Sequence, residues 1–194
     1  MATRATTKES SPTKAIRAPA KSPSRAKRQK DACDLLDADH KAVKAMFKEY
    51  ETLTESQSRS PAKKSQLADR ICRQLSVHAT VEEEMFYPAA RKAIKDNPLM
   101  NEATVEQAGA KDLIAQIRGM DAGDEMFDAK VTVLGEYIDH HVKEERTEIF
   151  PKVRKTKLDL VKLSEQLEQR KQALTAGREK GNASAPVNPS AIQA

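Results

Sequence analysis

One phrase occurs twice in this chain and constrains what the chain can fold into. The segments 78–88 and 141–151 align without a gap. Each begins with a histidine, carries a glutamate four residues later, and ends with an aromatic residue followed by proline. Residues four apart lie on one face of a helix, one turn above the other. Each segment therefore predicts a helix that presents an imidazole and a carboxylate side by side, which is a pair of metal ligands.

The two pairs are His78 with Glu82 and His141 with Glu145. A single pair of this kind often arises by chance and would be a weak signal. Two copies that share a distal proline, in a chain with only four histidines, form a stronger signal. The repeat therefore indicates a metal site built from two helices.

Apolar residues recur every three or four positions through long segments of the chain, which predicts amphipathic helices. Four such segments run over about residues 31–54, 61–95, 99–119 and 124–155. Pro88 lies inside the second segment and is expected to kink or loosen its last turns. Because short loops place neighbouring helices antiparallel, we predict an all-α, up-down-up-down four-helix bundle over residues 31–155. Residues 156–176 are predicted as a short extra C-terminal helix, with Leu158 to Leu174 helical, and residues 1–30 and 177–194 as disordered tails.

A few polar residues fall on the apolar stripes and should point into the bundle. They are His40, His78, Glu82, His141 and Glu145, with Glu106 or Gln107 from the third segment. A buried glutamate is costly unless it is paired or bound to a metal. The fourth stripe also distinguishes two adjacent histidines, because His141 continues the apolar row whereas His140 is rotated by about 100°. Imidazoles and carboxylates without a thiolate suit iron, manganese or zinc.

These motifs resemble those of the hemerythrin-like (HHE cation-binding) family. The matching residues are Asp39-His40, the HxxxEE stretch from His78 that ends in Tyr87-Pro88, and His140-His141-x-x-Glu144-Glu145 that ends in Phe150-Pro151. The resemblance covers about residues 31–155 and implies a four-helix bundle with a non-haem di-iron centre for oxygen binding or for oxygen, iron or redox sensing. It also implies site roles by position: terminal ligands His40, His78 and His141, and bridging carboxylates Glu82 and Glu145.

The third segment departs from the family pattern. Relatives usually offer Glu-His there, whereas this chain has Glu106-Gln107, so that Gln107 stands where a histidine is expected. An amide oxygen is a weaker ligand for these metals than imidazole. Gln107 is therefore the weaker candidate ligand. Three outcomes stay open: a di-iron site with altered reactivity, a site for one ion, or a bundle that has lost its metal.

The charge of the chain is unevenly distributed. Residues 1–30 carry nine Lys/Arg and one Glu, a net charge of +8, whereas the remaining residues carry 25 basic and 28 acidic side chains. The basic tail could contact nucleic-acid phosphates without sequence specificity. A tail that only keeps the protein solvated is the plainer interpretation.

Cysteine usage and hydropathy bear on location. Cys33 and Cys72 form no CxxC motif, which favours two reduced thiols in a cytoplasmic protein. No apolar run approaches the ~18 residues that span a bilayer, so we expect no membrane partner. The Arg- and Ser-rich N-terminus is compatible with an organellar transit peptide if the source is eukaryotic.

Three hypotheses of function follow. The first is a hemerythrin-like protein whose non-haem iron (one or two ions, with manganese or zinc as alternatives) binds dioxygen or another diatomic, or senses redox state or iron. The second is a metal-depleted helical interaction bundle whose basic tail binds nucleic acid or a partner. The third is an oxidase or peroxidase-like enzyme at the same centre. We lean away from an enzyme, because the sequence shows no separate nucleophile and base.

Overall fold

The computed structural model describes residues 1, 29–56 and 60–183, with side chains in the last helix described as far as residue 177. These residues form helices and no strands, which confirms the predicted all-α class. The predicted tail disorder falls mostly on residues 2–28 and 184–194, which lie outside the described residues, and stays a prediction.

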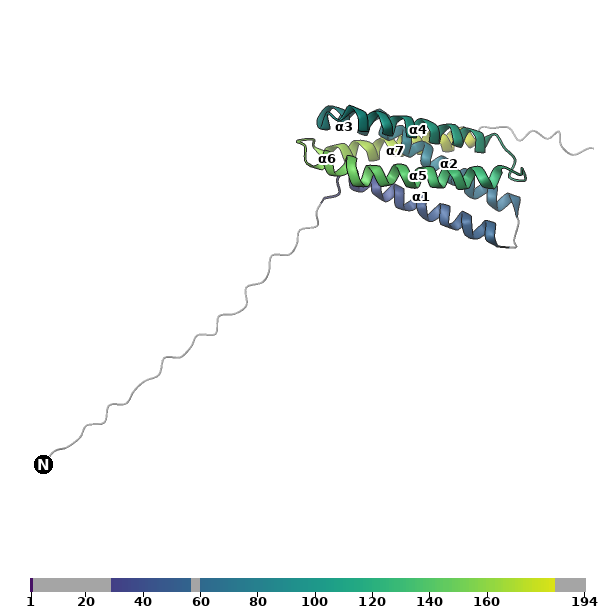
Figure 1. Ribbon diagram of the computed structural model, residues 1–194, viewed down its shortest axis with the longest axis horizontal. Coiled ribbons are helices and arrows are strands. Elements are labelled where there is room, and N and C mark those ends of the chain that lie inside the picture. Colours follow the sequence, from purple (N-terminus) through teal and green to yellow (C-terminus); the bar gives the residue numbers. More distant parts are fainter. Residues whose placement is uncertain (2–28, 57–59, 184–194) are drawn as a thin grey trace, which may run out of the picture.

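Four helical rods lie side by side in the bundle (Figure 1). The first is α1 (Ala32–Glu55), and the second joins α2 (Pro61–Val81), the π-helical turn η1 (Glu82–Phe86) and α3 (Tyr87–Ile94). The third is α4 (Asn97–Arg118), and the fourth joins α5 (Phe127–Glu144), the π-helical turn η2 (Glu145–Ile149) and α6 (Phe150–Arg154). α1 packs on α2 and α5, and α4 packs on the same two helices, so the four rods close into a ring.

Local sequence signals explain where several rods begin. The Asp31 side chain caps the N-terminus of α1 and forms a reciprocal capping box with Asp34. Pro61 occupies the first turn of α2, where its missing N–H costs nothing. Lys95 takes a left-handed conformation (φ 54°) that ends α3, and the Asp96 carboxylate then caps α4.

Both copies of the repeated phrase form a π-helical turn. The Tyr87 N–H donates to the carbonyl of Glu82, and the Phe150 N–H donates to the carbonyl of Glu145, five residues back in each case. A proline follows each turn, and proline lacks an N–H and clashes with the carbonyl four residues earlier. The loosening predicted at Pro88 therefore takes the form of a π turn just before it, a feature frequent at functional sites.

A layer of buried polar residues divides the core into two apolar clusters. One cluster surrounds Leu36, Phe86 and Phe150, and the other surrounds Ile71, Ile114 and Leu134. We call the residues between them the polar layer: Asp39, His40, His78, Glu82, Gln107, His141 and Glu145. Along each rod the polar residues lie where one cluster gives way to the other, although Glu82 directly follows Val81 of the cluster around Phe86. The polar layer is thus enclosed by hydrocarbon at both ends.

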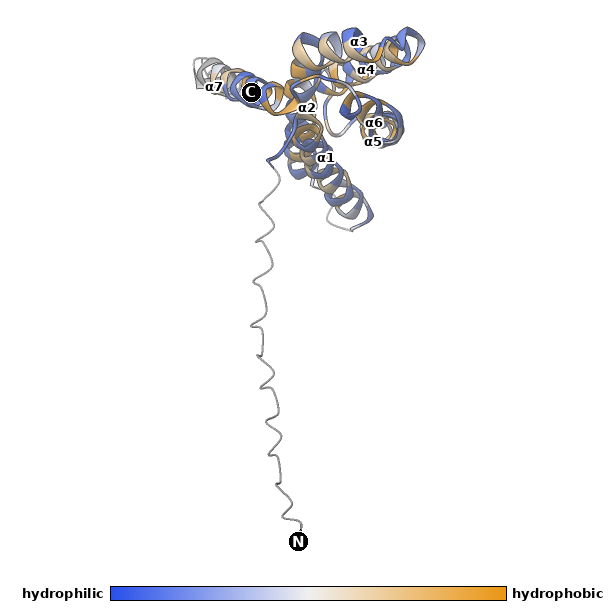
Figure 2. Cartoon of the chain, turned by 90° about the vertical axis from the view of Figure 1, so that its left-hand side faces the viewer, coloured by the Kyte–Doolittle hydropathy of each residue, from blue (hydrophilic) through white to orange (hydrophobic). Residues whose placement is uncertain are grey.

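A fifth long helix, α7 (Leu160–Ala183), lies outside the ring and packs on α1, α2 and η1 (Figure 2). Its Leu163 and Leu167 are buried in the cluster around Phe86. The helix is longer than the predicted span of 158–174, because Gly177 lowers helix propensity by only about 1 kcal/mol and does not end it. It therefore includes the first residues of the segment predicted as a tail.

Two further expectations from the sequence, on the cysteines and on membrane spans, can be compared with the structure. Cys33 and Cys72 are both buried and free, in agreement with the prediction of two unpaired thiols. Among the described residues, no helix is both long and apolar enough to cross a membrane.

Burial of Leu167 predicts that α7 contributes to the stability of the bundle. Leu167 has no exposed surface, so Leu167→Ala should lower the free energy of unfolding by about 2–5 kcal/mol. The matched control is Glu165→Ala, an exposed position on the same helix, which should change it by less than about 0.5 kcal/mol. Urea unfolding of the metal-free protein measures both, and equal effects would contradict the docked position of α7.

Candidate metal centre

The five predicted ligands come from three rods and all lie in the polar layer. His40 is on α1, and His78 is near the end of α2. Glu82 and Glu145 are the first residues of η1 and η2 and have 0% exposed surface. His141, near the end of α5, is buried, whereas the side chain of His140 is 64% exposed. The stripe argument therefore identified the inward histidine of that pair correctly.

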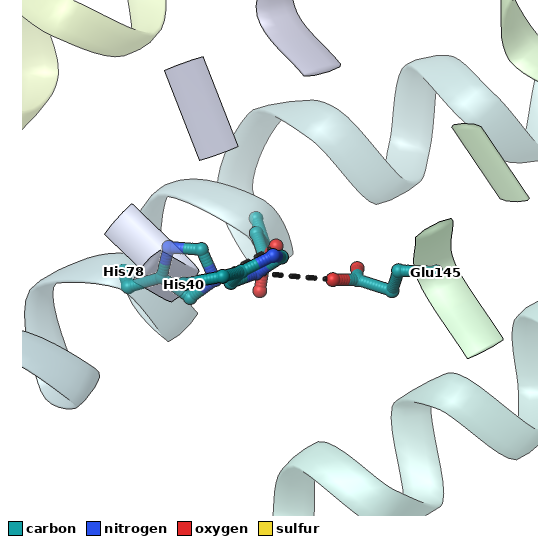
Figure 3. A group of neighbouring side chains, drawn as sticks. His40, His78 and Glu145 are labelled. Atoms are coloured by element: carbon teal, nitrogen blue, oxygen red, sulfur yellow. Dashed lines mark hydrogen bonds and ion pairs between the residues drawn. The ribbon is translucent and has the colours of Figure 1, made fainter. Parts of the chain in front are cut away.

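Four of the five residues form a tight group, which we call the four-donor cluster: His40, His78, Glu82 and Glu145. One ligand atom from each lies within 4.8 Å of the others. The Nε2 atoms of His40 and His78 are 2.9 Å apart. His78 Nε2 is 3.1 Å from Glu82 Oε1, and His40 Nε2 is 3.2 Å from Glu145 Oε2. Figure 3 shows His40, His78 and Glu145 pointing toward one another.

The chemistry of the four-donor cluster fits a divalent cation. Glu82 Oε1 and Glu145 Oε2 are buried and have no hydrogen-bond partner within the described residues. Two nitrogen ligands that are each ~2.1 Å from one ion stand about 3.0 Å apart at an octahedral angle of about 90° and about 3.4 Å apart at the tetrahedral angle. The observed 2.9 Å is closer to the octahedral value. Two carboxylates carry two negative charges, which a divalent ion would neutralise in this water-poor layer.

His141 lies on the other side of Glu145 and is not part of the four-donor cluster. Its Nε2 is 3.9 Å from Glu145 Oε1, and the Tyr87 hydroxyl lies 3.0 Å from each of these atoms. Tyr87 donates its proton to Glu145 Oε1. The structure thus brings the fifth predicted ligand close to the cluster, with a phenol hydroxyl between the imidazole and the carboxylate.

The Glu106-Gln107 pair of α4 also reaches the polar layer. The Gln107 amide Nε2 donates to Glu82 Oε2 at 2.7 Å, and Gln107 Oε1 is buried without a hydrogen-bond partner within the described residues. Glu106 Oε2 lies 2.7 Å from His141 Nδ1. Gln107 therefore holds a glutamate of the cluster, and Glu106 orients the separate histidine. Glu106 also approaches His140 and Glu144 at the surface, where these three side chains form an outer group.

Tyr87 is a site residue that the period of an α-helix does not indicate. Residues five apart differ in direction by about 140° on an α-helix, so Tyr87 is not expected on the same face as Glu82. The wider π turn brings residue i+5 back over residue i. Phe150 is the equivalent residue of the second copy, and its ring stacks parallel to that of His40, with centroids 6.0 Å apart.

Asp39 is a second site residue that no stripe indicates. Its Oδ2 lies 3.3 Å from Nδ1 of His78, on the side of the ring away from the four-donor cluster. A carboxylate behind a histidine of this kind fixes which ring nitrogen carries the proton. Two adjacent residues of α1 therefore contact opposite sides of the His78 ring. Asp39 contacts its Nδ1, and His40 contacts its Nε2.

The electrostatics of the layer favour protonated histidines when no cation is bound. Burial opposes the charged form of His78, but the Glu82 charge and the Asp39 hydrogen bond outweigh burial and raise its pKa to about 10. Burial likewise opposes protonation of His141, whose pKa is nevertheless raised by Glu145, Glu82 and Glu106. For Glu145, burial favours the neutral acid, but the adjacent histidines lower its pKa to about 2. A proton on an imidazole thus compensates the buried carboxylates.

Comparison with protein families gives a match over residues 31–153 to the hemerythrin HHE cation binding domain. A curated relative from Nostoc sp., named DNA nickase, is 29% identical over 121 residues, which are 62% of this chain and 33% of the relative. The chain thus spans about a third of that relative. A solved structure, a hemerythrin HHE cation binding domain-containing protein from Mycobacterium kansasii, aligns with a TM-score of 0.66 and 18% identity over 80% of this chain and 93% of that one. This likeness supports the fold.

The raised pKa of His78 predicts that metal binding releases protons. An imidazole must be neutral to bind a metal, and below a pKa of about 10 His78 carries a proton that the metal displaces. The apparent affinity for a divalent ion should therefore rise with pH, by about tenfold per unit for each proton released between about pH 6 and pH 8. Calorimetry in buffers of different ionisation enthalpy measures the number of protons. The exposed-histidine variant His140→Gln should release the same number, and a pH-independent affinity would contradict this prediction.

Proposed function

Because the chain belongs to the hemerythrin HHE cation-binding family, we propose that it binds non-haem iron in the four-donor cluster. We further propose that this iron binds dioxygen or another diatomic, or responds to redox state or iron supply. The observation that carries the proposal is the pair of buried carboxylate oxygens, on Glu82 and Glu145, that face two imidazole nitrogens without hydrogen-bond partners of their own within the described residues.

The donor types limit which ion the site would select. Two imidazoles and two carboxylates suit iron, and also manganese or zinc, and exclude ions that require thiolate ligands. Iron(II) bound there would supply an open coordination position and reversible one-electron chemistry. The surrounding residues would control access: the two apolar clusters keep bulk water out, and the Phe150 ring lies parallel to the His40 ring. Such exclusion favours binding of a small apolar molecule over an anion.

We propose one tightly held ion for each chain and a weaker second position on the His141 side. Two groups support this asymmetry. Tyr87 donates to Glu145 Oε1, and the Gln107 amide donates to Glu82 Oε2, so the carboxylate oxygens that face this side already accept hydrogen bonds. A second ion would have to displace both of these hydrogen bonds. The first ion would meet two carboxylate oxygens that accept no hydrogen bond within the described residues.

Iron content after anaerobic loading tests the primary proposal. The wild-type chain should retain about one iron after desalting, and its near-ultraviolet absorption should change on exposure to air. Glu82→Gln removes one charged donor and should weaken iron binding by at least about tenfold. The matched control is Glu83→Gln, next along the chain, whose carboxylate pairs with Lys111 at the surface, and it should retain wild-type iron. Less than one-tenth of an iron per wild-type chain would overturn the proposal.

Replacing Gln107 by histidine tests the asymmetry between the two positions. Gln107→His removes the amide donor from Glu82 Oε2 and adds an imidazole on the His141 side. At saturating iron, the content should rise from about one ion to about two per chain, because imidazole is a stronger ligand than an amide. Metal analysis beside the wild type measures this change. An unchanged count would show that Gln107 is not what limits the second position.

Nucleic-acid contact through residues 1–30 stays a second candidate function. One observation favours it beyond the charge of the tail: the relative from Nostoc sp. is named DNA nickase, although the match covers a third of that protein. The tail lies mostly outside the described residues. DNA-binding assays on the full chain and on a chain lacking residues 1–30 are the direct test, and equal affinity of the two would remove the tail from consideration.

A further inference from the structure

Helix α7 lies outside the four-rod ring, yet one of its side chains reaches the polar layer. Lys171 Nζ donates to Asp39 Oδ1 at 2.7 Å. The two side chains are only 16% and 10% exposed. The other oxygen of Asp39 lies 3.3 Å from Nδ1 of His78. A continuous chain of polar contacts therefore runs from the outer helix to a histidine of the four-donor cluster.

The donor and the acceptor of each hydrogen bond in this chain of contacts are fixed by chemistry. An ammonium group can only donate hydrogen bonds, and an ionised carboxylate can only accept them. Asp39 therefore accepts from Lys171 through one oxygen and from the His78 Nδ1–H through the other. With the proton on Nδ1, the lone pair of neutral His78 lies on Nε2, which faces His40 and Glu82. The contact with Asp39 thus selects the tautomer that can bind a metal.

The position of Lys171 explains why Asp39 needs a second partner. Lys171 lies in the wall of a groove of about 1280 Å³ between α2 and α7, which Gln74, Val77 and Thr175 also line. Without the ammonium group, Asp39 Oδ1 would face the groove and water would compete for the carboxylate. The carboxylate could then rotate away from His78. Lys171 closes this route with a charge-assisted hydrogen bond, which is stronger than a neutral one.

Arg170, which precedes Lys171 on α7, forms an ion pair at the surface with Glu84. Arg170 donates to both oxygens of Glu84, at 2.7 and 2.9 Å. Both side chains are about two-fifths exposed, at 41% and 43%. Within the described residues, neither forms a hydrogen bond or ion pair with a member of the four-donor cluster. Exposed pairs of this kind contribute little to stability. Arg170 therefore provides a matched control for Lys171.

We propose that Lys171 is a positioning residue for the metal site, which acts through Asp39 to fix the orientation and tautomer of His78. The C-terminal helix is then a component of the site as well as a cover over the bundle. This inference rests on the proposed metal site in the four-donor cluster. It adds a residue that lies beyond the segment matched to the family, which ends at residue 153.

Cobalt(II) titration of the full-length protein tests the inference, because the visible spectrum of the ion reports its coordination as well as its affinity. Lys171→Met keeps the aliphatic stem and removes the charge. It should weaken Co(II) binding by about 10–100-fold and alter the visible spectrum. Arg170→Gln should change the affinity less than about twofold. Unfolding of the metal-free proteins measures any general loss of helix docking separately.

A double-mutant cycle with Asp39→Asn distinguishes positioning from a general effect. Asp39→Asn alone should weaken Co(II) binding to a similar degree. If Lys171→Met folds poorly, Lys171→Gln, which also removes the charge, takes its place in the cycle. Adding Lys171→Met to Asp39→Asn should then have less than about a twofold further effect, because Lys171 acts through Asp39.

The outcomes separate this inference from the proposed function. Wild-type protein that binds Co(II) beside a Lys171→Met variant with the same affinity and spectrum would overturn the role of Lys171 and leave the metal site standing. Full additivity in the cycle would overturn it as well. Wild-type protein that binds neither Co(II) nor iron would overturn the proposed function, and the positioning role with it.

Discussion

Two glutamates with no exposed surface, buried in the middle of a helical bundle, are the constraint on which the rest of this structure depends. An ionised carboxylate taken out of water costs several kcal/mol unless partners surround it. Glu82 and Glu145 therefore require the other polar groups that face them, including three imidazoles, an amide and a phenol. Because the polar atoms of these groups gather between the two apolar clusters, each cluster can remain continuous on its own side. The polar layer therefore compensates the buried charges of these two glutamates.

The two copies of the repeated phrase make different contacts around these two glutamates. Each copy ends a helix in a π turn and directs an aromatic residue toward a histidine of another rod. In the second copy this residue is Phe150, which stacks on His40 and leaves its Nε2 facing Glu145. In the first copy it is Tyr87, whose hydroxyl lies between His141 and Glu145. The Tyr87 hydroxyl, which Phe150 lacks, therefore donates a hydrogen bond to Glu145 Oε1 on the His141 side. Glu145 Oε2, on the His40 side, accepts no hydrogen bond within the described residues.

The rods and the inward residues could be predicted because an α-helix has one period. His40, His78 and His141 fall on apolar stripes, and the same count places His140 at the surface. The count fails where the helix widens, so it does not place Tyr87 beside Glu145. It also says nothing of partners from other helices: the amide of Gln107 on Glu82 and the carboxylate of Asp39 behind His78 depend on how the rods pack. The glutamine at position 107 can be read from the sequence, but its hydrogen bond to Glu82 cannot.

One sequence signal for the outer helix was nevertheless present. Leu163, Leu167 and Lys171 recur every four residues, so Lys171 continues the stripe that docks α7 on the bundle. A lysine on an apolar stripe is costly unless its ammonium group finds an anion, just as a glutamate is costly without a cation. The stripe that buries two leucines therefore also directs Lys171 toward Asp39. The same helical register therefore packs α7 on the bundle and places Lys171 against Asp39. A change in how α7 docks is expected to alter the contact between Asp39 and His78.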